Sequence, residues 1–242
     1  SRPDITYEGG PQMKKFVLTA CVAALIVGVT ACQTIRPTGT PSGKTPVVFV
    51  HGWSADETTW NAAVDHFKAA GYTAGDIDVL YYDTSLSAAD ASAKLATEVD
   101  YLKTYTGKAK VDIVSHSFGS MVTKYCIEKG ACANKVSHWM SLAGADNGTS
   151  TSAICAPVQA SCADMAGTTT TIKDLQAAWG QITTQNVKVE VQWSTNDGTI
   201  VPAENSKNPA PAVNVSVNSA LGHLDIPKDA TVLTKTVNFF TR

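Results

Sequence analysis

The chain has 242 residues, 44% of them hydrophobic and 17% charged, which is enough apolar sequence for one sizeable core. Its formal net charge is −2 and neither sign of charge is clustered, so the sequence lacks the basic stripe of a nucleic-acid-binding protein. We therefore expect one domain with no nucleic-acid partner.

The N-terminus indicates a processing segment. Met13 precedes two lysines and an apolar run over 16–31 that is too short to span a bilayer comfortably and is followed by a polar stretch. We interpret residues 1–12 as sequence upstream of the biological start and residues 13–31 as a signal peptide.

The apolar run ends in Val29-Thr30-Ala31-Cys32, which resembles a bacterial lipobox, where the cysteine is lipidated after cleavage. An ordinary secretory signal would be cut at the same place. The sequence thus predicts either a cell-envelope lipoprotein, attached to a membrane through lipidated Cys32, or a secreted protein. Cleavage there would leave a formal charge of about −3.

The composition of residues 32–45, rich in Pro, Thr and Gly, predicts a flexible tether, and residues 46–242 are expected to form the folded domain. Along this domain, short apolar runs alternate with helical periodicity. The expected elements, in chain order, are a strand over 46–52, a helix over 56–70, a strand over 77–82, a helix over 87–107, a strand over 110–115, a helix from 118 to about 130, a strand over 136–142, a helix over 172–180, strands over 187–193 and 213–217, and a helix over 230–240. This alternation predicts a single-domain α/β fold, a mostly parallel sheet with helices on both faces.

Four cysteines remain after Cys21 and Cys32 are set aside. An even number in an exported chain predicts disulfides with three possible connectivities, and we favour the two pairs that each span one short loop. Each loop would contribute roughly 2–2.5 kcal/mol. Spacings of six and seven residues, with no histidine at ligand distance, do not suit zinc, so we expect no metal site. The favoured pairs are Cys126–Cys132 and Cys155–Cys162.

The strand over 110–115 leads into Ser117, and a helical pattern begins at once. Strand, sharp turn and helix are typical of a nucleophile elbow, which holds a serine hydroxyl clear of the backbone. Gly119 supplies the small residue that the turn needs two places after the serine, and Ser115 replaces the usual glycine two places before it. A simple turn serine is the alternative.

Asp197 and His223 follow two later strands, and the carboxyl ends of parallel strands share one edge of a sheet. Imidazole can take the proton of a serine hydroxyl, and a carboxylate on its other nitrogen fixes the tautomer. The chain order Ser, Asp, His is that of the α/β-hydrolase triad. Alternatively, Asp197 forms an Asp-Gly turn and His223 is structural; Asp225 and Asp146 are the reserve acids.

A developing oxyanion needs backbone donors. The amide of Phe118, next after the nucleophile, should be one, and the amide of Trp53 in the loop after the first strand the other, with Ser54 as second choice. His51 is expected to shape that loop, whereas His116 should point away from the site. His66 on a helix and His138 in a strand are weaker candidates.

Four patches, VVFVHGW, VDIVSHSFGS, DGTIVP and GHL, resemble a small bacterial secreted lipase or esterase of the α/β-hydrolase superfamily, of the compact Bacillus type. The resemblance implies hydrolysis of carboxylic esters, often triacylglycerols, without a cofactor, with Ser117, Asp197 and His223 as the triad. It also implies that the amides of Trp53 and Phe118 form the oxyanion hole. The cysteines and the Thr-rich loop over 167–171 are not part of the compact pattern and leave the acyl pocket undefined.

Three rival functions remain open. A polyester or polyhydroxyalkanoate depolymerase and a short-chain carboxylesterase would use the same triad. A lipid-anchored binding protein on this fold would not use it. We expect a monomer whose partner is a lipid or ester substrate. No insertion is long enough for a large lid domain, so little interfacial activation is expected.

Overall fold

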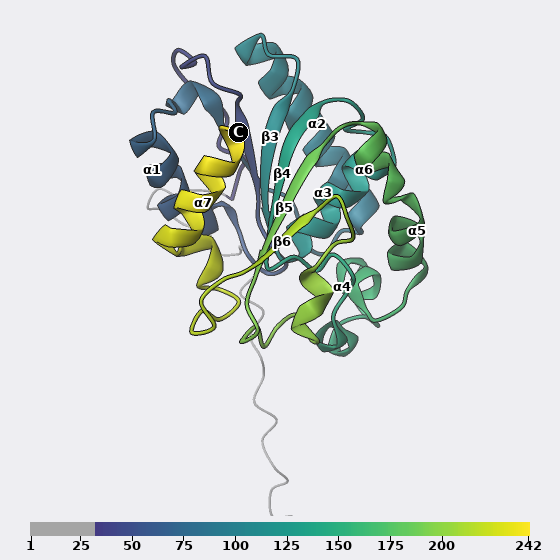
Figure 1. Cartoon of the computed structure of the whole chain (residues 1–242). Helices are drawn as coiled ribbons and strands as arrows, with labels where there is room; N and C mark the ends of the chain where they lie inside the picture. Colours follow the sequence, from purple (N-terminus) through teal and green to yellow (C-terminus); the bar gives the residue numbers. More distant parts are fainter. Residues whose placement is uncertain (1–31) are drawn as a thin grey trace, which may run out of the picture. The chain divides into compact units, whose positions relative to one another are not determined.

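Six parallel strands organise residues 32–242, which are the residues that the computed structural model describes (Figure 1). The proposed upstream segment and signal peptide lie outside them. The sheet order is β2-β1-β3-β4-β5-β6, and every neighbouring pair is parallel. The strands are β1 (Val47–Val50), β2 (Ile77–Leu80), β3 (Val111–His116), β4 (Val136–Leu142), β5 (Lys188–Trp193) and β6 (Val213–Ser216).

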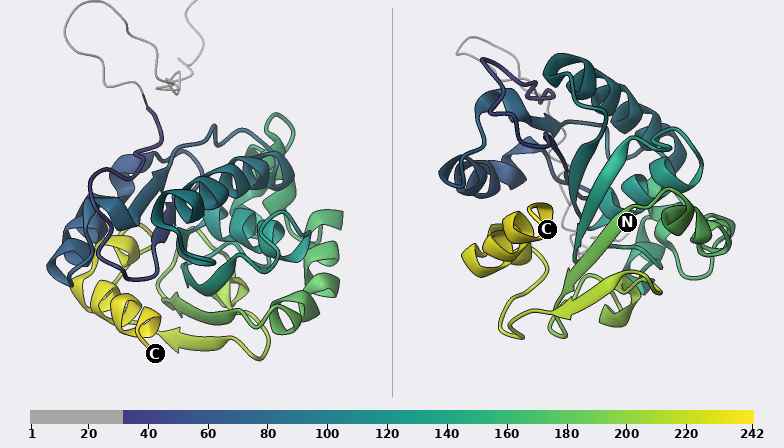
Figure 2. Two further views of the ribbon diagram at one scale, coloured as in Figure 1. Left: turned by 90° about the horizontal axis from the view of Figure 1, so that it is seen from above. Right: turned by 45° about the horizontal axis from the view of Figure 1, so that its top comes forward.

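Helices cover both faces of the sheet. One face packs against α1 and α7, and the other against α2, α3, α5 and α6, as Figures 1 and 2 show. The α-helices are α1 (Asn61–Ala69), α2 (Ala88–Thr106), α3 (Phe118–Glu128), α4 (Ala160–Met165), α5 (Thr170–Ala178), α6 (Gly180–Thr184) and α7 (Ala230–Phe240). Short 3-10 helices are η1 (Glu57–Trp60), η2 (Ala74–Asp76), η3 (Ser150–Ile154), η4 (Ala203–Ser206) and η5 (Ile226–Lys228).

Strand β1 shows why its sequence is apolar throughout. Val48 and Val50 belong to the core with α2 and α3, whereas Val47 and Phe49 belong to the core with α1 and α7. All four side chains are fully buried. Because successive side chains of a strand point to opposite faces, a strand covered on both faces needs apolar residues at every position.

Most of the predicted elements are confirmed. The strand over 136–142 and the helix over 230–240 have the expected bounds. Helix α2 begins after Ser87, whose hydroxyl accepts from the Asp90 amide at 3.1 Å, and ends at Gly107 with φ of 69°. The helix expected over 172–180 is instead two helices, α5 and α6, and α4 was not predicted because six residues carry too little periodicity.

The segment over 32–45, expected to be a flexible tether, is packed on the domain. Ile35 forms an antiparallel bridge with Val79 of β2, with both N···O distances 2.9 Å. Arg36 makes a two-pronged ion pair with Glu98 of α2 at 2.9 and 3.0 Å. Its composition suggested flexibility, but these long-range partners, invisible in a local pattern, hold it on the domain and cover the outer edge of β2.

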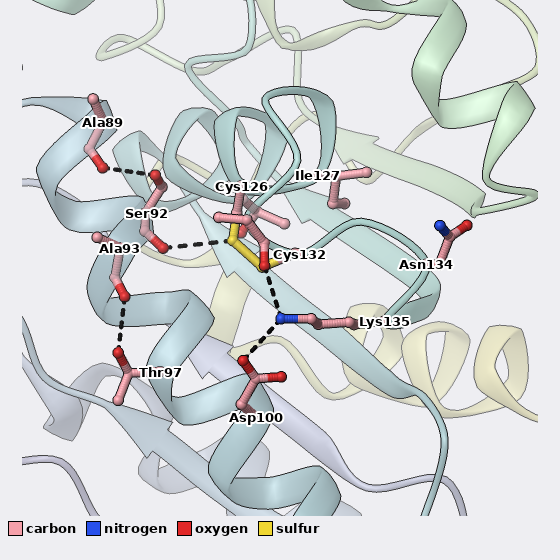
Figure 3. Close-up of a disulfide and its surroundings, with 12 residues drawn as sticks. Ala89, Ser92, Ala93, Thr97, Asp100, Cys126, Ile127, Cys132, Asn134 and Lys135 are labelled. Carbon is pink, nitrogen blue, oxygen red and sulfur yellow. Dashed lines mark hydrogen bonds and ion pairs between the residues drawn. A yellow bond between two sulfur atoms is a disulfide. The ribbon is translucent and has the colours of Figure 1, made fainter.

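Both favoured disulfides are present. Cys126 at the end of α3 joins Cys132 in the following turn, beside α2, with 5.1 Å between Cα atoms (Figure 3). Cys155 joins Cys162 across the loop between η3 and α4, with 5.6 Å between Cα atoms. Such bonds persist in oxidising compartments, so they are consistent with an extracytoplasmic location.

Candidate active site

The direction of the chain connections in the sheet reverses between β1 and β3. The chain leaves β1 for β2 on one side and reaches β3 on the other, so the two loops that follow β1 and β3 diverge. Ligands of open α/β sheets bind at such a switch point. Gly52 in the first loop lies directly against Ser117 in the second, since a Cβ on Gly52 would be 2.7 Å from the Ser117 Cβ.

Ser117 occupies a strained turn between β3 and α3. Its φ of 56° and ψ of −127° lie where non-glycine residues are rare, so the surrounding structure must hold it there. Three backbone bonds do so: its amide donates to Leu142 O at 3.1 Å, and its carbonyl accepts from the amides of Ser120 and Ala145 at 3.0 Å each. This is the geometry predicted for a nucleophile elbow.

The two residues that flank the elbow motif have different reasons to be small. A side chain on Gly119 would clash with the carbonyl oxygens of Val50 and His51. Ser115 is fully buried, and its hydroxyl lies 3.0 Å from that of Ser120 and accepts from Trp139 Nε1 at 2.7 Å. Ser115, which replaces the usual glycine, is therefore held by hydrogen bonds beneath the turn that carries Ser117.

A hydrogen bond joins the side chains of Asp197 and His223. Asp197 Oδ2 lies 2.7 Å from His223 Nδ1, and both residues are buried. The other carboxylate oxygen accepts from the amides of Thr199 and Ile200 at 2.8 and 2.9 Å, which fixes the orientation of the carboxylate. With Nδ1 engaged by Asp197, Nε2 is the imidazole nitrogen left for another partner.

His116 lies beside this pair rather than away from it, which corrects the sequence-based expectation. The centroids of the His116 and His223 rings are 4.6 Å apart, and His116 Nε2 lies 3.0 Å from the main-chain oxygen of His223. Burial, together with the neighbouring His223, holds the pKa of His116 well below its usual range, so the imidazole is neutral and donates this hydrogen bond.

The reserve acids have other partners. Asp225 is exposed and accepts from the Gly222 amide at 2.9 Å, closing its own turn. Asp146 is fully buried and accepts from Ser141 and Asn208 at 2.8 Å each. Burial raises the pKa of Asp146 to about 6. Neither carboxylate contacts His223 among the hydrogen bonds of the described chain.

The remaining histidines have partners outside the pair formed by Asp197 and His223. His51 is buried, stacks on Tyr82 at 4.5 Å between centroids, and has its pKa lowered to about 4 by burial. Its Nδ1 lies 3.0 Å from the Gly52 carbonyl oxygen in the loop after β1. His66 contacts the Thr234 hydroxyl at 3.2 Å, and His138 contacts Asp112 at 2.8 Å.

Hydrogen bonds in the loop after β1 distinguish the two amides that were candidates for the second oxyanion donor. The Ser54 amide donates to the Thr84 hydroxyl at 3.1 Å and is already engaged. The Trp53 amide donates to none of the described residues, and its indole Nε1 donates to Gln159 at 2.7 Å. Phe118 is the first residue of α3, where a main-chain amide has no partner within the helix.

Ser117 and His223 line one cavity of about 520 Å³. One wall comes from the segment over 149–165, which the disulfide Cys155–Cys162 closes and which had been left undefined from the sequence. In the sequence, only the paired cysteines had indicated this segment. Over residues 32–242 no cluster of three or more histidine, cysteine or acidic side chains could hold a metal ion. The lining residues are Gly52, Trp53, Ser54, Ala55, Thr59, His116, Ser117, Thr149, Thr151, Ser152, Ile154, Cys155, Met165, Gly198, Thr199, Ile200, His223, Leu224, Pro227 and Lys228.

Residues 44–219 match the sequence family described as Lipase (class 2). The chain belongs to the class 2 lipase family. Members of this family are lipolytic hydrolases, which agrees with the fold and with the resemblance found in the four sequence patches.

Solved structures that resemble this class 2 lipase share its fold at low sequence identity. The mature form of the Bacillus licheniformis lipase BlEst2 superposes with a TM-score of 0.69 at 16% identity, over 86% of this chain and 96% of that one. The propeptide form gives the same score, and the chain spans 52% of its length. Aspergillus fumigatus lipase B gives a TM-score of 0.71 at 14% identity, over 86% of this chain and 56% of that one.

Proposed function

We propose that this class 2 lipase hydrolyses carboxylic esters of lipids, triacylglycerols among them, through an acyl-enzyme formed on Ser117. The observation that carries the proposal is the bond between Asp197 and His223 at the wall of the cavity that also holds Ser117. The lipase names of the family and of its structural relatives support a lipid ester as the substrate.

In the proposed reaction, Ser117 Oγ attacks the ester carbonyl carbon while His223 Nε2 takes the proton of the Ser117 hydroxyl. Asp197 holds the tautomer that leaves Nε2 free and stabilises the imidazolium that forms. The proton then passes to the leaving alcohol. Water, activated by the same imidazole, attacks the acyl-enzyme and releases the acid.

The amides of Trp53 and Phe118 are the proposed donors to the oxyanion. Phe118 follows the nucleophile at the start of α3, where the helix dipole adds a partial positive charge. The engagement of Ser54 by Thr84 favours Trp53 as the second donor. Losing one such donor typically lowers the rate about 10²–10³-fold.

We also propose that the protein is exported and remains attached to a membrane through a lipid on Cys32. The lipobox-like residues 29–32 motivate this proposal, and the two disulfides fit export. Among the described residues no helix is both long and apolar enough to cross a bilayer. Mass spectrometry of the N-terminal peptide from the native host tests the proposal, since an unmodified cysteine would refute lipidation.

The hydrolysis of p-nitrophenyl esters of two to sixteen carbons tests the activity and ranks the acyl chains. We expect turnover that Ser117→Ala lowers by several orders of magnitude, on the order of 10⁶-fold as for other triads. Lipid esters should be cleaved faster than polyester films, which would separate the lipase from a depolymerase. An unchanged rate in Ser117→Ala would refute the assignment.

A further inference from the structure

The segment over 143–149, which follows β4, contacts the main chain at two parts of the candidate site. At one end, the Ala145 amide donates to the carbonyl oxygen of Ser117 at 3.0 Å. At the other end, the Thr149 hydroxyl donates at 2.6 Å to a carbonyl oxygen in the turn that follows Asp197. One short segment therefore connects the turn of the proposed nucleophile with the turn of the proposed acid.

The carbonyl that Thr149 binds belongs to the same peptide unit as an amide that holds Asp197. A peptide unit joins the carbonyl of one residue to the amide of the next and is planar. The Thr199 carbonyl oxygen accepts from the hydroxyls of Thr149 and Thr151 at 2.6 and 2.7 Å, and the Ile200 amide of this unit donates to Asp197 Oδ1 at 2.9 Å. Because the unit is rigid, fixing its oxygen also fixes the direction of the N–H that orients the carboxylate.

The Thr149 hydroxyl also binds the next peptide unit. It accepts from the Val201 amide at 2.9 Å, and the Ser150 amide donates to the Val201 carbonyl oxygen at 3.0 Å. One side chain thus fixes the peptide units on both sides of Ile200. Among the hydrogen bonds of residues 32–242, the Thr151 hydroxyl reaches only the first of these units. The loss of the Thr149 hydroxyl would leave the Val201 amide without its side-chain partner.

Thr149 is itself firmly held, and its hydroxyl is fully used. The residue is 2% exposed, and its amide donates to the Met165 carbonyl oxygen at 2.8 Å. A hydroxyl group has one hydrogen to donate and two lone pairs to accept. The hydrogen goes to Thr199, and the lone pairs accept from the amides of Val201 at 2.9 Å and Thr151 at 3.3 Å. Although Thr149 lines the cavity, its hydroxyl has no hydrogen left for a substrate.

We propose that Thr149 is a positioning residue that keeps the Asp197 carboxylate oriented toward His223. The inference rests on the proposed function, because it takes these two residues as the acid and the base of the triad. Thr149 acts through the peptide unit that it binds and not through the ester. Its hydroxyl should therefore contribute to kcat and have little effect on KM.

Steady-state hydrolysis of a soluble p-nitrophenyl ester tests the role. Thr149→Val keeps the shape of the side chain but removes the hydroxyl, and kcat should fall roughly 10- to 100-fold, the scale of a buried group left without its partner. KM should change less than about threefold. Thr149→Ser keeps the hydroxyl and should recover most of kcat. Melting curves check that each variant folds, and Thr149→Ala takes the place of Thr149→Val if valine prevents folding.

Thr236→Val on α7 is the matched control. Thr236 is fully buried, and its hydroxyl donates to the main-chain oxygen of Val232 at 2.9 Å, so the same substitution removes the same kind of bond away from the cavity. It should leave kcat unchanged. A fall in kcat for Thr236→Val as large as that for Thr149→Val would overturn the specific role of Thr149.

The same substitution on the Asp197→Asn background separates positioning from a general structural effect. If Thr149 acts through the charge of Asp197, Thr149→Val should lower the residual kcat of Asp197→Asn less than about threefold. A general effect would lower it by the same factor as in the wild-type protein. Equal losses on both backgrounds, a change in KM instead of kcat, or a Thr149→Ser protein as slow as Thr149→Val would overturn the proposal.

The wild-type and Ser117→Ala rates separate this inference from the proposed function. If the wild-type protein hydrolyses the ester, Ser117→Ala does not, and Thr149→Val keeps the wild-type kcat, the positioning role is wrong and the function stands. If the wild-type protein leaves the ester untouched, or Ser117→Ala retains the full rate, the proposed function is wrong and the inference falls with it.

Discussion

His116 and His223 are held together by a ring contact of 4.6 Å and by a 3.0 Å hydrogen bond from His116 Nε2 to the His223 carbonyl oxygen. The residue next to the proposed nucleophile therefore fixes the main chain of the proposed base. Since the two are 107 positions apart in sequence, this bond locks the loop over 218–225 onto the elbow.

The bond predicts a positioning role for His116. His116→Leu removes the donor and should lower kcat/KM about tenfold, the scale of one buried hydrogen bond. His116→Gln, which keeps a donor, should recover much of the loss. Steady-state rates on a soluble ester check this, and His116 itself should add no ionisation to the pH–rate profile, because burial lowers the pKa of its imidazole well below the usual range. Equal losses in both variants would contradict the role.

Asp197 can be distinguished from the reserve acid Asp225 by matched substitutions. Asp197→Asn keeps the shape but removes the charge that stabilises the imidazolium and allows the wrong tautomer, so kcat should fall about 10⁴-fold. Asp225→Asn still offers an oxygen to the Gly222 amide and should change kcat less than about threefold. Steady-state rates on a soluble ester measure both. A larger fall in kcat for Asp225→Asn than for Asp197→Asn would instead identify Asp225 as the acid of the triad.

The two disulfides should have different effects. Replacing Cys126 and Cys132 by alanine should lower the free energy of unfolding by roughly 2–2.5 kcal/mol, because their disulfide closes a short loop and so restricts the unfolded chain. The KM should remain unchanged. Replacing Cys155 and Cys162 should cost a similar amount and also raise KM for long-chain esters, because Cys155 lines the cavity. Denaturant unfolding and KM profiles test both pairs. An unchanged KM in the second pair would exclude that wall from substrate binding.

Asp78 should make stability depend on pH. Its carboxylate is fully buried, neither oxygen has a hydrogen-bond partner among the described residues, and burial raises its pKa to about 8. The folded state therefore holds a proton that the unfolded chain releases near pH 4, and this group lowers stability as the pH rises from about 4 to 8, by at most about 1.4 kcal/mol per pH unit.

Asp78→Asn imitates the protonated acid and should raise Tm relative to wild type at pH 8 to 9, with the difference shrinking near pH 5. Asp174→Asn, at an exposed position on α5, is the control and should leave the pH dependence of Tm unchanged. Melting curves across this range decide the matter. A constant difference between Asp78→Asn and wild type would rule out titration of Asp78.

The sequence predicted those parts of the fold that local patterns determine. The apolar runs of β1 and β3 have residues on both faces in the core, and the small residue at Gly119 permits the close approach that the turn at Ser117 requires. The packing of the segment over 33–45 on β2 could not be predicted, because it depends on partners such as Glu98, 62 positions from Arg36.

Some residues of the candidate site could likewise be predicted from the sequence, and others could not. Residue types and chain order were enough to select Asp197 and His223, because only certain groups can assist a serine hydroxyl. The contact between His116 and His223 depends on how two loops meet in space, and the sequence gives no local sign of it. The cavity wall over 149–165 was visible only as a pair of cysteines, which indicates a closed loop without showing where that loop packs.

Labelling with a fluorophosphonate, followed by intact mass measurement and peptide mapping, tests the central claim most directly. We expect one adduct per chain, located on Ser117, absent in Ser117→Ala and formed at least about 10³-fold more slowly in His223→Ala, since the serine hydroxyl needs its base. A folded protein that remains unlabelled, or that is labelled at another residue, would contradict the assignment of Ser117 as the nucleophile.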